Sequence, residues 1–292
     1  MAIVGKAPGS PGFAARRWVS TGVLGLVTLY TLIPLVYVIL ASTKDERDLF
    51  STFGFWFGSE FNLAQNFESL FTYQGGIYWT WMWNTVWYST VSSIGAVITS
   101  AAAGYAFSKF DFTGKKFWFA ALLGSVMVPS TALVIPLFLM MTEVGLVNTP
   151  WAVILPHLVF PLGVYLMRIF ADEGIPNELI EAARLDGASE FYIFTAIGLR
   201  LMTPGIVTVL LLAFTGSWNN FFLPLVVLNS TEYYPLTVGL AGWYQTANAA
   251  TTGASLYSVV MIGALVSILP IILAFLLLQR YWRGGITAGS LK

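Results

Sequence analysis

Apolar residues gather along the chain in long runs that shorter polar intervals separate. A helix needs about 20 apolar residues to cross a hydrocarbon core ~30 Å thick. Six runs approach or exceed that length, at residues 19–42, 85–107, 117–141, 151–170, 204–228 and 257–282. The first run is longer than the ~7–15-residue apolar core of a signal peptide, which favours an uncleaved first span. The pattern predicts an all-α, polytopic membrane protein with six transmembrane helices over residues 18–282.

The basic residues predict which side of the membrane each loop occupies. All but two of the 14 lysine and arginine residues flank the runs on one side, and the exceptions are Lys44 and Arg47. Cytoplasmic loops carry an excess of these residues. We therefore expect a cell-membrane protein with cytoplasmic tails at 1–17 and 283–292. The outer loop before residue 85 ends in the aromatic tract 79–83, which is typical of a lipid interface.

The polar interval 171–203 contains a short predicted helix from Pro176 to Leu185. Proline is favoured at the start of a helix and glycine just after its end, where Gly187 stands. About 12 residues at ~1.5 Å each reach only ~18 Å, so this helix is too short to span a membrane. We expect it to lie at the cytoplasmic surface or to dock into a partner.

Two side-chain arrangements are possible on this short helix. Glu181 and Arg184 are three residues apart and could pair with each other, or Glu181 could contact a partner. Leu179, Ile180 and Ala183 can share one apolar face. The small residue at 183 would let another backbone approach closely.

Composition excludes several functional classes. Apolar residues make up 57% of the chain and charged residues only 10%, which is unlike an ordinary soluble domain. The net charge of zero implies no attraction to nucleic acid. There are no cysteines and one histidine, so disulfides, thiolate metal sites, iron–sulfur clusters and histidine metal sites are excluded.

The chain shows no energy source of its own. No Asp, Glu, Lys or Arg stands in the middle of a run, whereas ion-driven carriers usually place ionisable groups there. His157 is the single candidate for a proton relay, and a satisfied hydrogen bond is the favoured role for it. The segment 112–116 superficially resembles a P-loop, but Lys109 and Lys116 occupy positions that require Gly and Ser or Thr. Energy then comes from another subunit, or transport is passive.

One motif gives the chain a family resemblance. Glu181-Ala182-Ala183, then Gly187 and then Ile197-x-Leu199, resembles the EAA loop of importer permeases in the ABC transporter superfamily. Further stretches resemble carbohydrate permeases, and these lie at 104–116, 135–149, 218–221, 236–240 and 285–289. The chain is identified as similar to the second permease of the maltose-type pair.

The resemblance implies three groups of functional residues. The EAA helix is the coupling helix that seats in a cleft of the ATPase, through Glu181, Ala182, Ala183, Arg184, Asp186 and Gly187. The substrate path is expected at Trp218, Asn219 and Asn220, unless Trp218 only packs against a neighbouring span and the amides cap freed carbonyls. Contact with the binding protein is expected from Tyr233, Tyr234, Trp243 and Tyr244. The family usually has an acidic residue where Asn220 stands, and Leu-Pro where Leu199-Arg200 stands.

The implied assembly contains a second homologous permease, two ATPase subunits and an extracytoplasmic sugar-binding protein. ATP and magnesium would bind to the ATPase subunits, so this chain is not an enzyme and holds no cofactor. It would move a mono- or oligosaccharide inward by alternating access. Two alternatives stay open, a permease of the same architecture for a polyol or glycerol phosphate, and an ion-coupled carrier or membrane-embedded enzyme.

Overall fold

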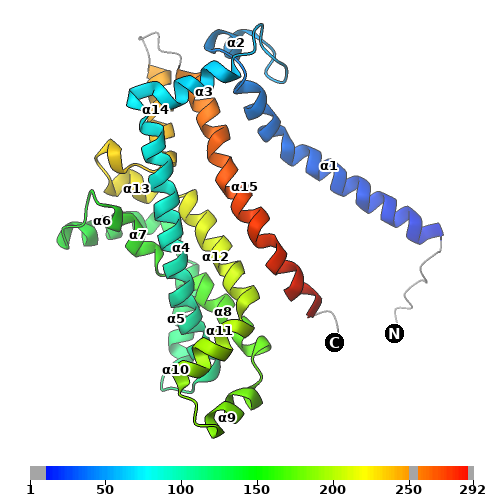
Figure 1. Ribbon diagram of the computed structural model, residues 1–292, viewed down its shortest axis with the longest axis vertical. Coiled ribbons are helices and arrows are strands. Elements are labelled where there is room, and N and C mark those ends of the chain that lie inside the picture. The colour runs from blue at the N-terminus through cyan, green and yellow to red at the C-terminus, as the bar shows by residue number, and fades with distance from the viewer. Residues whose placement is uncertain (1–10, 250–255, 289–292) are drawn as a thin grey trace. The chain divides into compact units, whose positions relative to one another are not determined.

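The computed structural model describes residues 11–249 and 256–288, and every regular element in these ranges is helical. Long helices alternate with short ones (Figure 1). Their bounds are α1 (Pro11–Ala41), α2 (Glu46–Ser51), α3 (Leu63–Thr72), α4 (Ile77–Lys109), α5 (Lys115–Val126), α6 (Val134–Glu143), α7 (Pro150–His157), α8 (Pro161–Gly174), α9 (Asn177–Leu185), α10 (Glu190–Tyr192), α11 (Leu199–Leu201), α12 (Thr203–Trp218), α13 (Phe222–Val227), α14 (Leu236–Ala249) and α15 (Leu256–Ala288). The all-α fold class is as predicted.

The chain forms two compact units. Described residues up to Leu70, with those of Ala247–Leu265, make the first unit, and those of Phe71–Thr246, with those from Val266 on, make the second. Each unit is described by itself below. The expected tails 1–17 and 283–292 lie partly outside the described residues, and their described parts belong to α1 and α15.

The long helices coincide with most of the apolar runs. Within the described ranges, four helical stretches are long and apolar enough to cross a membrane, or six when each of two bent pairs counts as one span. Three of the runs are interrupted. The run 117–141 forms α5 and then Ser130–Glu143 at an angle of 99°, the run 151–170 is divided between α7 and α8, and the run 204–228 is split between α12 and α13. The second bent pair is Glu190–Leu201 with Thr203–Trp218, at 78°.

Prolines account for these and other helix breaks. Proline lacks a backbone N–H and disfavours the helical conformation in the residue before it. Pro129 lies between α5 and the following turn in an extended conformation, with ψ of 128°. Pro161 opens α8 after Phe160, whose backbone is not helical (φ of −126° and ψ of 86°), so α7 and α8 are separate helices.

In the second unit α4 packs between α8 and α12 at glycine contacts (Figure 1). A Cβ atom at Gly104 would lie 2.6 Å from Met167 Cβ and 2.7 Å from the backbone nitrogen of Arg168. The backbones of α4 and α8 therefore touch, as small residues allow in membrane helix packing. The cluster beneath this contact joins α4, α8, α9 and α12 through Ala101, Tyr105, Met167, Ala171, Ile175, Ile180, Ile193, Met202 and Val209.

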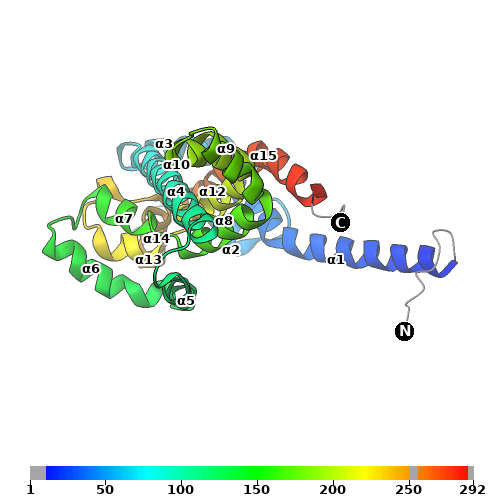
Figure 2. The ribbon, with the colours of Figure 1, turned by 90° about the horizontal axis from the view of Figure 1, so that it is seen from below.

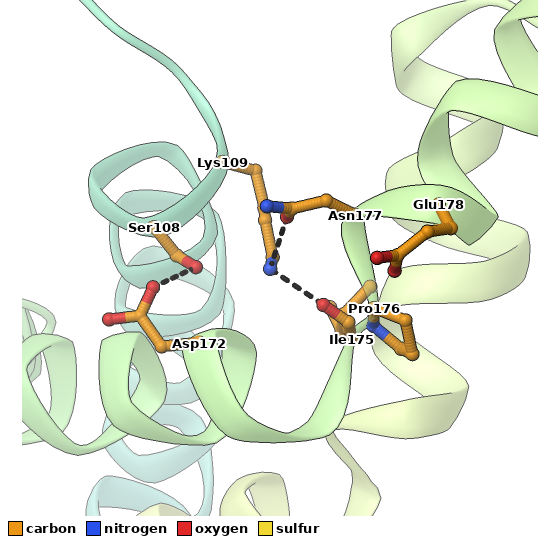
Figure 3. Close-up of a pocket in the computed structure, with 7 residues that line it drawn as sticks. All are labelled: Ser108, Lys109, Asp172, Ile175, Pro176, Asn177 and Glu178. Carbon is orange, nitrogen blue, oxygen red and sulfur yellow. Dashed lines mark hydrogen bonds between the residues drawn. The ribbon is translucent and has the colours of Figure 1, made fainter.

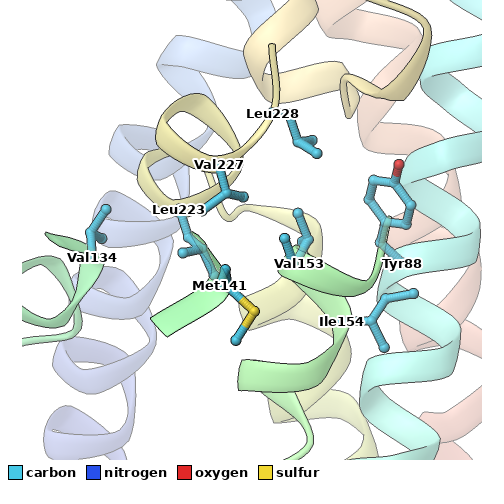
Figure 4. Packing of buried hydrophobic residues seen from close by; sticks show 9 residues of the cluster. Tyr88, Val134, Met141, Val153, Ile154, Leu223, Val227 and Leu228 are labelled. Atoms are coloured by element: carbon cyan, nitrogen blue, oxygen red, sulfur yellow. The ribbon is translucent and has the colours of Figure 1, made fainter. Parts of the chain in front are cut away.

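A second apolar cluster lies at the other end of α4. It joins α4 to the bent segments α6, α7 and α13, which gather on one side of the second unit (Figures 2 and 4). Its buried members are Tyr88, Val134, Met141, Ala152, Val153, Ile154, Leu223, Val227 and Leu228. Short helices that are too small to stand alone are thus held by a common core.

Candidate functional site

The short helix α9 has the start and the end that the sequence predicts. Pro176 precedes it in an extended conformation, with ψ of 137°. At its end Gly187 takes the left-handed conformation, with φ of +81°. The Gly187 N–H donates to the Arg184 carbonyl, and the Ala188 N–H donates to the Ala183 carbonyl, each at 3.0 Å. These bonds satisfy carbonyls that a helix end leaves unpaired, and glycine adopts this conformation without a steric penalty.

The two faces of α9 differ from the sequence-based expectation. Ile180 is only 3% exposed and belongs to the core cluster, against which Ala183 also packs. Leu179 is exposed, so the three residues do not form one surface for a partner. The outward face instead carries Leu185, whose side chain is 88% exposed, beside the exposed residues Glu181, Ala182 and Asp186.

A double hydrogen bond ties α9 to α10. Arg184 Nε and Nη2 donate to Glu190 Oε1 and Oε2, at 2.6 and 3.1 Å. The pair of Glu181 with Arg184, one of the two arrangements that the sequence allowed, is therefore absent, and Arg184 pairs with Glu190 instead. The hydrogen bond from Arg184 holds the pKa of the Glu190 carboxyl below its usual value. Glu181 forms no ion pair among the described residues, and its carboxylate is exposed. The hydrogen bond to Glu190 favours the charged form of Arg184, and the negative charge of Glu181 adds to this effect.

The ion pair positions two aromatic side chains that the sequence analysis did not select. Phe191 and Tyr192 follow Glu190 directly and are 75% and 59% exposed. Together with Leu185 they make an exposed apolar surface on α9 and α10, which we call the docking face. In the sequence, the signal for this surface is the pair of adjacent aromatic residues inside the polar interval 171–203.

Lys109 joins the end of α4 to the start of α9 (Figure 3). Its Nζ donates to the Ile175 carbonyl at 2.7 Å and to Asn177 Oδ1 at 3.0 Å. Beside it, Ser108 Oγ donates to Asp172 Oδ1 at 2.5 Å. These groups line a polar cavity of about 320 Å³. The ammonium also lies at the C-terminal end of α8, where a helix carries partial negative charge.

The substrate-path candidates lie at the break between α12 and α13. Trp218 is only 3% exposed, and its ring centroid lies 5.5 Å from that of Phe214. Asn219 Nδ2 donates to the Thr215 carbonyl at 2.9 Å, while the residue stays exposed. In this conformation Trp218 packs and Asn219 caps a carbonyl, which is the alternative that the sequence left open.

Asn220 instead connects three segments that are far apart in the sequence. Its Nδ2 lies 2.8 Å from His157 Nε2, at the end of α7, and its carbonyl accepts from Thr237 Oγ1 of α14 at 2.7 Å. His157 Nδ1 lies 2.8 Å from the Val153 carbonyl, which can only accept. His157 thus donates through Nδ1 and accepts from Asn220 through Nε2. Hydrogen bonds to both ring nitrogens agree with the favoured role of His157.

The expected outer loop 229–256 contains a helix, α14, and a turn that α4 holds in place. Trp81 Nε1, Asn84 Nδ2 and Tyr88 Oη donate to carbonyls of residues 231–234 at 2.7–3.0 Å. Tyr233 and Tyr234 are half-buried and pack against the cluster around Tyr88.

Trp243 was expected to contact the binding protein at the surface, and this expectation is wrong, because Trp243 is a core residue. It is 4% exposed, its ring centroid lies 4.6 Å from that of Trp81, and its Nε1 donates to Gln74 Oε1 at 3.2 Å. Of the four expected binding-protein contacts, only Tyr244 is exposed, with about half of its surface accessible. Trp81 itself is 2% exposed, so it is not at a lipid interface, whereas Trp79 and Trp83 are exposed.

Replacing Trp243 with Ala is expected to destabilise the protein by about 3–5 kcal/mol, because it leaves a large cavity against Trp81. Thermal unfolding of the purified chain in detergent measures this loss. Tyr244→Ala is the matched control, since its side chain is 48% exposed, and we expect its unfolding temperature to stay near that of the wild type. Equal unfolding temperatures for both variants would contradict the core position of Trp243.

Comparisons with known proteins show the family of the chain. Residues 96–283 match the model of a family described as binding-protein-dependent transport system inner membrane component. An arabinooligosaccharides transport system permease protein, AraQ of Halalkalibacterium halodurans, is 37% identical over 94% of this chain and 96% of its own length. A trehalose transport system permease protein, SugB of Mycobacterium tuberculosis, is 31% identical over 95% of this chain and 99% of its own.

The fold is also found in a solved structure. A chain in the crystal structure of a bacterial ABC transporter involved in the import of the acidic polysaccharide alginate superposes with a TM-score of 0.79. The two chains are 24% identical, over 95% of this chain and 100% of that one.

Proposed function

The chain belongs to the family of binding-protein-dependent transport system inner membrane components, and we propose that it is the second permease of an ATP-driven sugar importer. Membership makes it a multi-pass membrane protein that serves as the transport component and not as the catalytic subunit. A substrate-binding protein and a separate ATPase accompany such a component. The proposed assembly also contains a homologous partner permease and two ATPase subunits that hold ATP and magnesium. Both termini of this chain would lie in the cytoplasm.

The observation that carries the coupling role is the outward face of α9. Leu185, Phe191 and Tyr192 expose apolar surface at the end of the bundle, and no described residue covers them. Exposed apolar groups in a cytoplasmic loop are stabilised when a partner buries them. We assign the ATPase cleft as that partner, with Glu181, Ala182, Ala183, Arg184, Asp186 and Gly187 shaping the helix that enters it.

The contacts on the other face of α9 give a route from the ATPase to the membrane. Ile180 belongs to the core cluster, so a displacement of α9 by the ATPase would move that cluster too. Lys109 adds a direct link, because its hydrogen bonds fix the α8–α9 turn to the end of α4. Closure of the ATPase subunits would then move α4 and α8 together, and this rigid-body motion would open the pathway to the other side.

Replacing Lys109 with Ala is expected to lower sugar uptake per ATP hydrolysed by severalfold. The variant loses two hydrogen bonds of a charged donor, each of which contributes on the order of 1.5–3 kcal/mol. We expect the complex to assemble and hydrolyse ATP, because the docking face is unchanged. The measurement is the ratio of uptake to hydrolysis in proteoliposomes.

The matched control for Lys109 is Lys115→Ala. Lys115 Nζ also donates to a backbone carbonyl, that of Phe110, but it holds only its own turn. This control should keep the wild-type ratio, and Lys109→Arg should restore part of it. An unchanged ratio in Lys109→Ala would show that this link does not transmit the movement.

The sugar substrate is inferred from the relatives, whose names refer to arabinooligosaccharides and trehalose. Competition for uptake tests it, with unlabelled arabinooligosaccharides, trehalose, a polyol and glycerol phosphate added in turn to the complete transporter and its binding protein. We expect only sugars to compete. Competition by glycerol phosphate or the polyol alone would favour the alternative permease of the same architecture.

The substrate path is proposed at the break between α12 and α13, where Asn219 is exposed. Trp218 is buried in this conformation, so it could reach a sugar only in another state of the transport cycle. The Asn220 side chain is hydrogen-bonded to His157. We propose that this bond links the α12–α13 break to the α7–α8 break, and that Asn220 does not bind the sugar. On the outer side, Tyr244 is the strongest remaining candidate for contact with the binding protein.

A further inference from the structure

The segment 50–61, which begins with the last two residues of α2, exposes an unusual number of aromatic side chains, and we call it the aromatic lobe. The rings of Phe53, Trp56 and Phe61 are 66–72% exposed. The other exposed rings of the lobe are Phe50, Phe55 and Phe57. Glu60 is its single charged residue. Aromatic side chains are normally large contributors to cores, so this exposure calls for a specific environment.

Hydrogen bonds attach the lobe to the end of α1. The N–H of Asn62, the first residue after the lobe, donates to the Thr43 carbonyl at 2.8 Å. Asn66 Nδ2 donates to the carbonyls of Ser42 and Lys44 at 2.8 and 2.9 Å. Because Ser42 follows the last residue of α1 directly, these bonds hold the C-terminal end of the lobe where that helix leaves its apolar run (Figure 1).

The lobe also folds back along α1. The ring centroids of Phe55 and Tyr37 are 5.7 Å apart, in an edge-on arrangement. A Cβ atom at Gly54 would lie 3.1 Å from the Tyr37 ring. Tyr37 stands four residues before the end of α1, or about 6 Å inside it at ~1.5 Å per residue. The ring of Phe55 therefore reaches the level of the last apolar turn of a candidate membrane span.

The polar groups at the base of the lobe point inward. Lys44 is 1% exposed, and its Nζ donates to Thr52 Oγ1 and the Phe53 carbonyl, each at 2.9 Å. Asp48 is buried too, and its Oδ2 accepts from the backbone N–H and the hydroxyl of Ser59. The lobe thus covers the charges at its base and presents aromatic rings, with Glu60 as its one exposed charged residue.

We propose that the aromatic lobe lies in the interfacial region of the lipid bilayer beside α1 and anchors that helix there. Trp is enriched at the level of the headgroups, and segments that lie in this interface bury Phe and Trp side chains about 5–10 Å into the boundary with the acyl chains. The depth of Phe55 beside Tyr37 favours lipid over a soluble protein, because a protein outside the membrane cannot reach one turn inside a spanning helix. This anchoring role goes beyond the proposed transport function and does not depend on the substrate.

Spin-label accessibility in the complete transporter tests the proposal. The chain has no cysteine, so Trp56→Cys gives a single labelling site, and Phe61→Cys is a second one should the first disturb folding. Collision with lipid-soluble oxygen is compared with collision with a water-soluble nickel chelate, in nanodiscs of phosphatidylethanolamine and phosphatidylglycerol. Val27→Cys, in the middle of α1, is the lipid reference, and Arg47→Cys, exposed on α2, is the water reference.

We expect both lobe sites to show an oxygen-to-nickel ratio severalfold above that of Arg47→Cys and below that of Val27→Cys. A ratio equal to that of Arg47→Cys would overturn the proposal. Protection from nickel that arises only when the sugar-binding protein is added would also overturn it, and would assign the lobe to the binding protein instead.

Discussion

Replacing Leu185 with Glu is expected to abolish ATP-driven sugar uptake while the chain stays folded in the membrane. The side chain is 88% exposed, so the change removes little packing within this chain. Docking into an ATPase cleft would bury the new carboxylate without a partner, at a cost of about 2–5 kcal/mol. Since ~1.4 kcal/mol is a tenfold change in affinity, the complex should lose the ATPase subunits during purification.

The matched change on the other face of the same helix is Ile180→Ala. Ile180 is 3% exposed, and a buried isoleucine truncated to alanine costs about 2–5 kcal/mol of folding free energy. We therefore expect Ile180→Ala to lower the unfolding temperature and Leu185→Glu to leave it unchanged. Retention of the ATPase and normal uptake in Leu185→Glu would refute the docking face.

Replacing Gly104 with Ala is expected to cause a large loss of folded protein for a change of one methyl group. The new Cβ would lie 2.6–2.8 Å from Met167 and from the backbone of α8, and a backbone cannot move aside as a flexible side chain can. Overpacking of this kind costs about 1–3 kcal/mol or more, which exceeds the ~1 kcal/mol that alanine gains in helix propensity.

Gly124→Ala is the control for this prediction, because a Cβ at Gly124 in α5 would meet no atom within 4 Å. Its unfolding temperature should equal or exceed that of the wild type. We expect Gly104→Ala to unfold several degrees lower in the same detergent. If both variants unfolded at the same temperature, α4 and α8 could not be in backbone contact.

Local chemistry made α9 predictable. Proline fixes the backbone at its start, and glycine accepts the left-handed conformation at its end, so both bounds follow from residues within the segment. The direction of its faces does not follow in this way. Apolar spacing shows that Ile180 and Ala183 are buried somewhere, but it cannot distinguish the core of the same chain from a partner.

Contacts between segments that are distant in the sequence account for most of the features that the sequence did not predict. The hydrogen bond of Trp243 joins residues 169 positions apart, and nothing near Trp243 in the sequence shows that Gln74 and Trp81 will surround it. The Asn220–His157 bond joins residues 63 positions apart. A residue that looks like a surface contact within a short loop can therefore be the core of the folded unit.

The energy source of transport tests the central claim most directly. The complete transporter is placed in proteoliposomes with the sugar-loaded binding protein on the outside and ATP inside, and uptake is measured with and without a protonophore. We expect uptake to require internal ATP and to be unchanged by the protonophore, and the purified chain alone to hydrolyse no ATP. Uptake that proceeds without ATP and stops when the proton gradient collapses would contradict the account and make His157 the first residue to test.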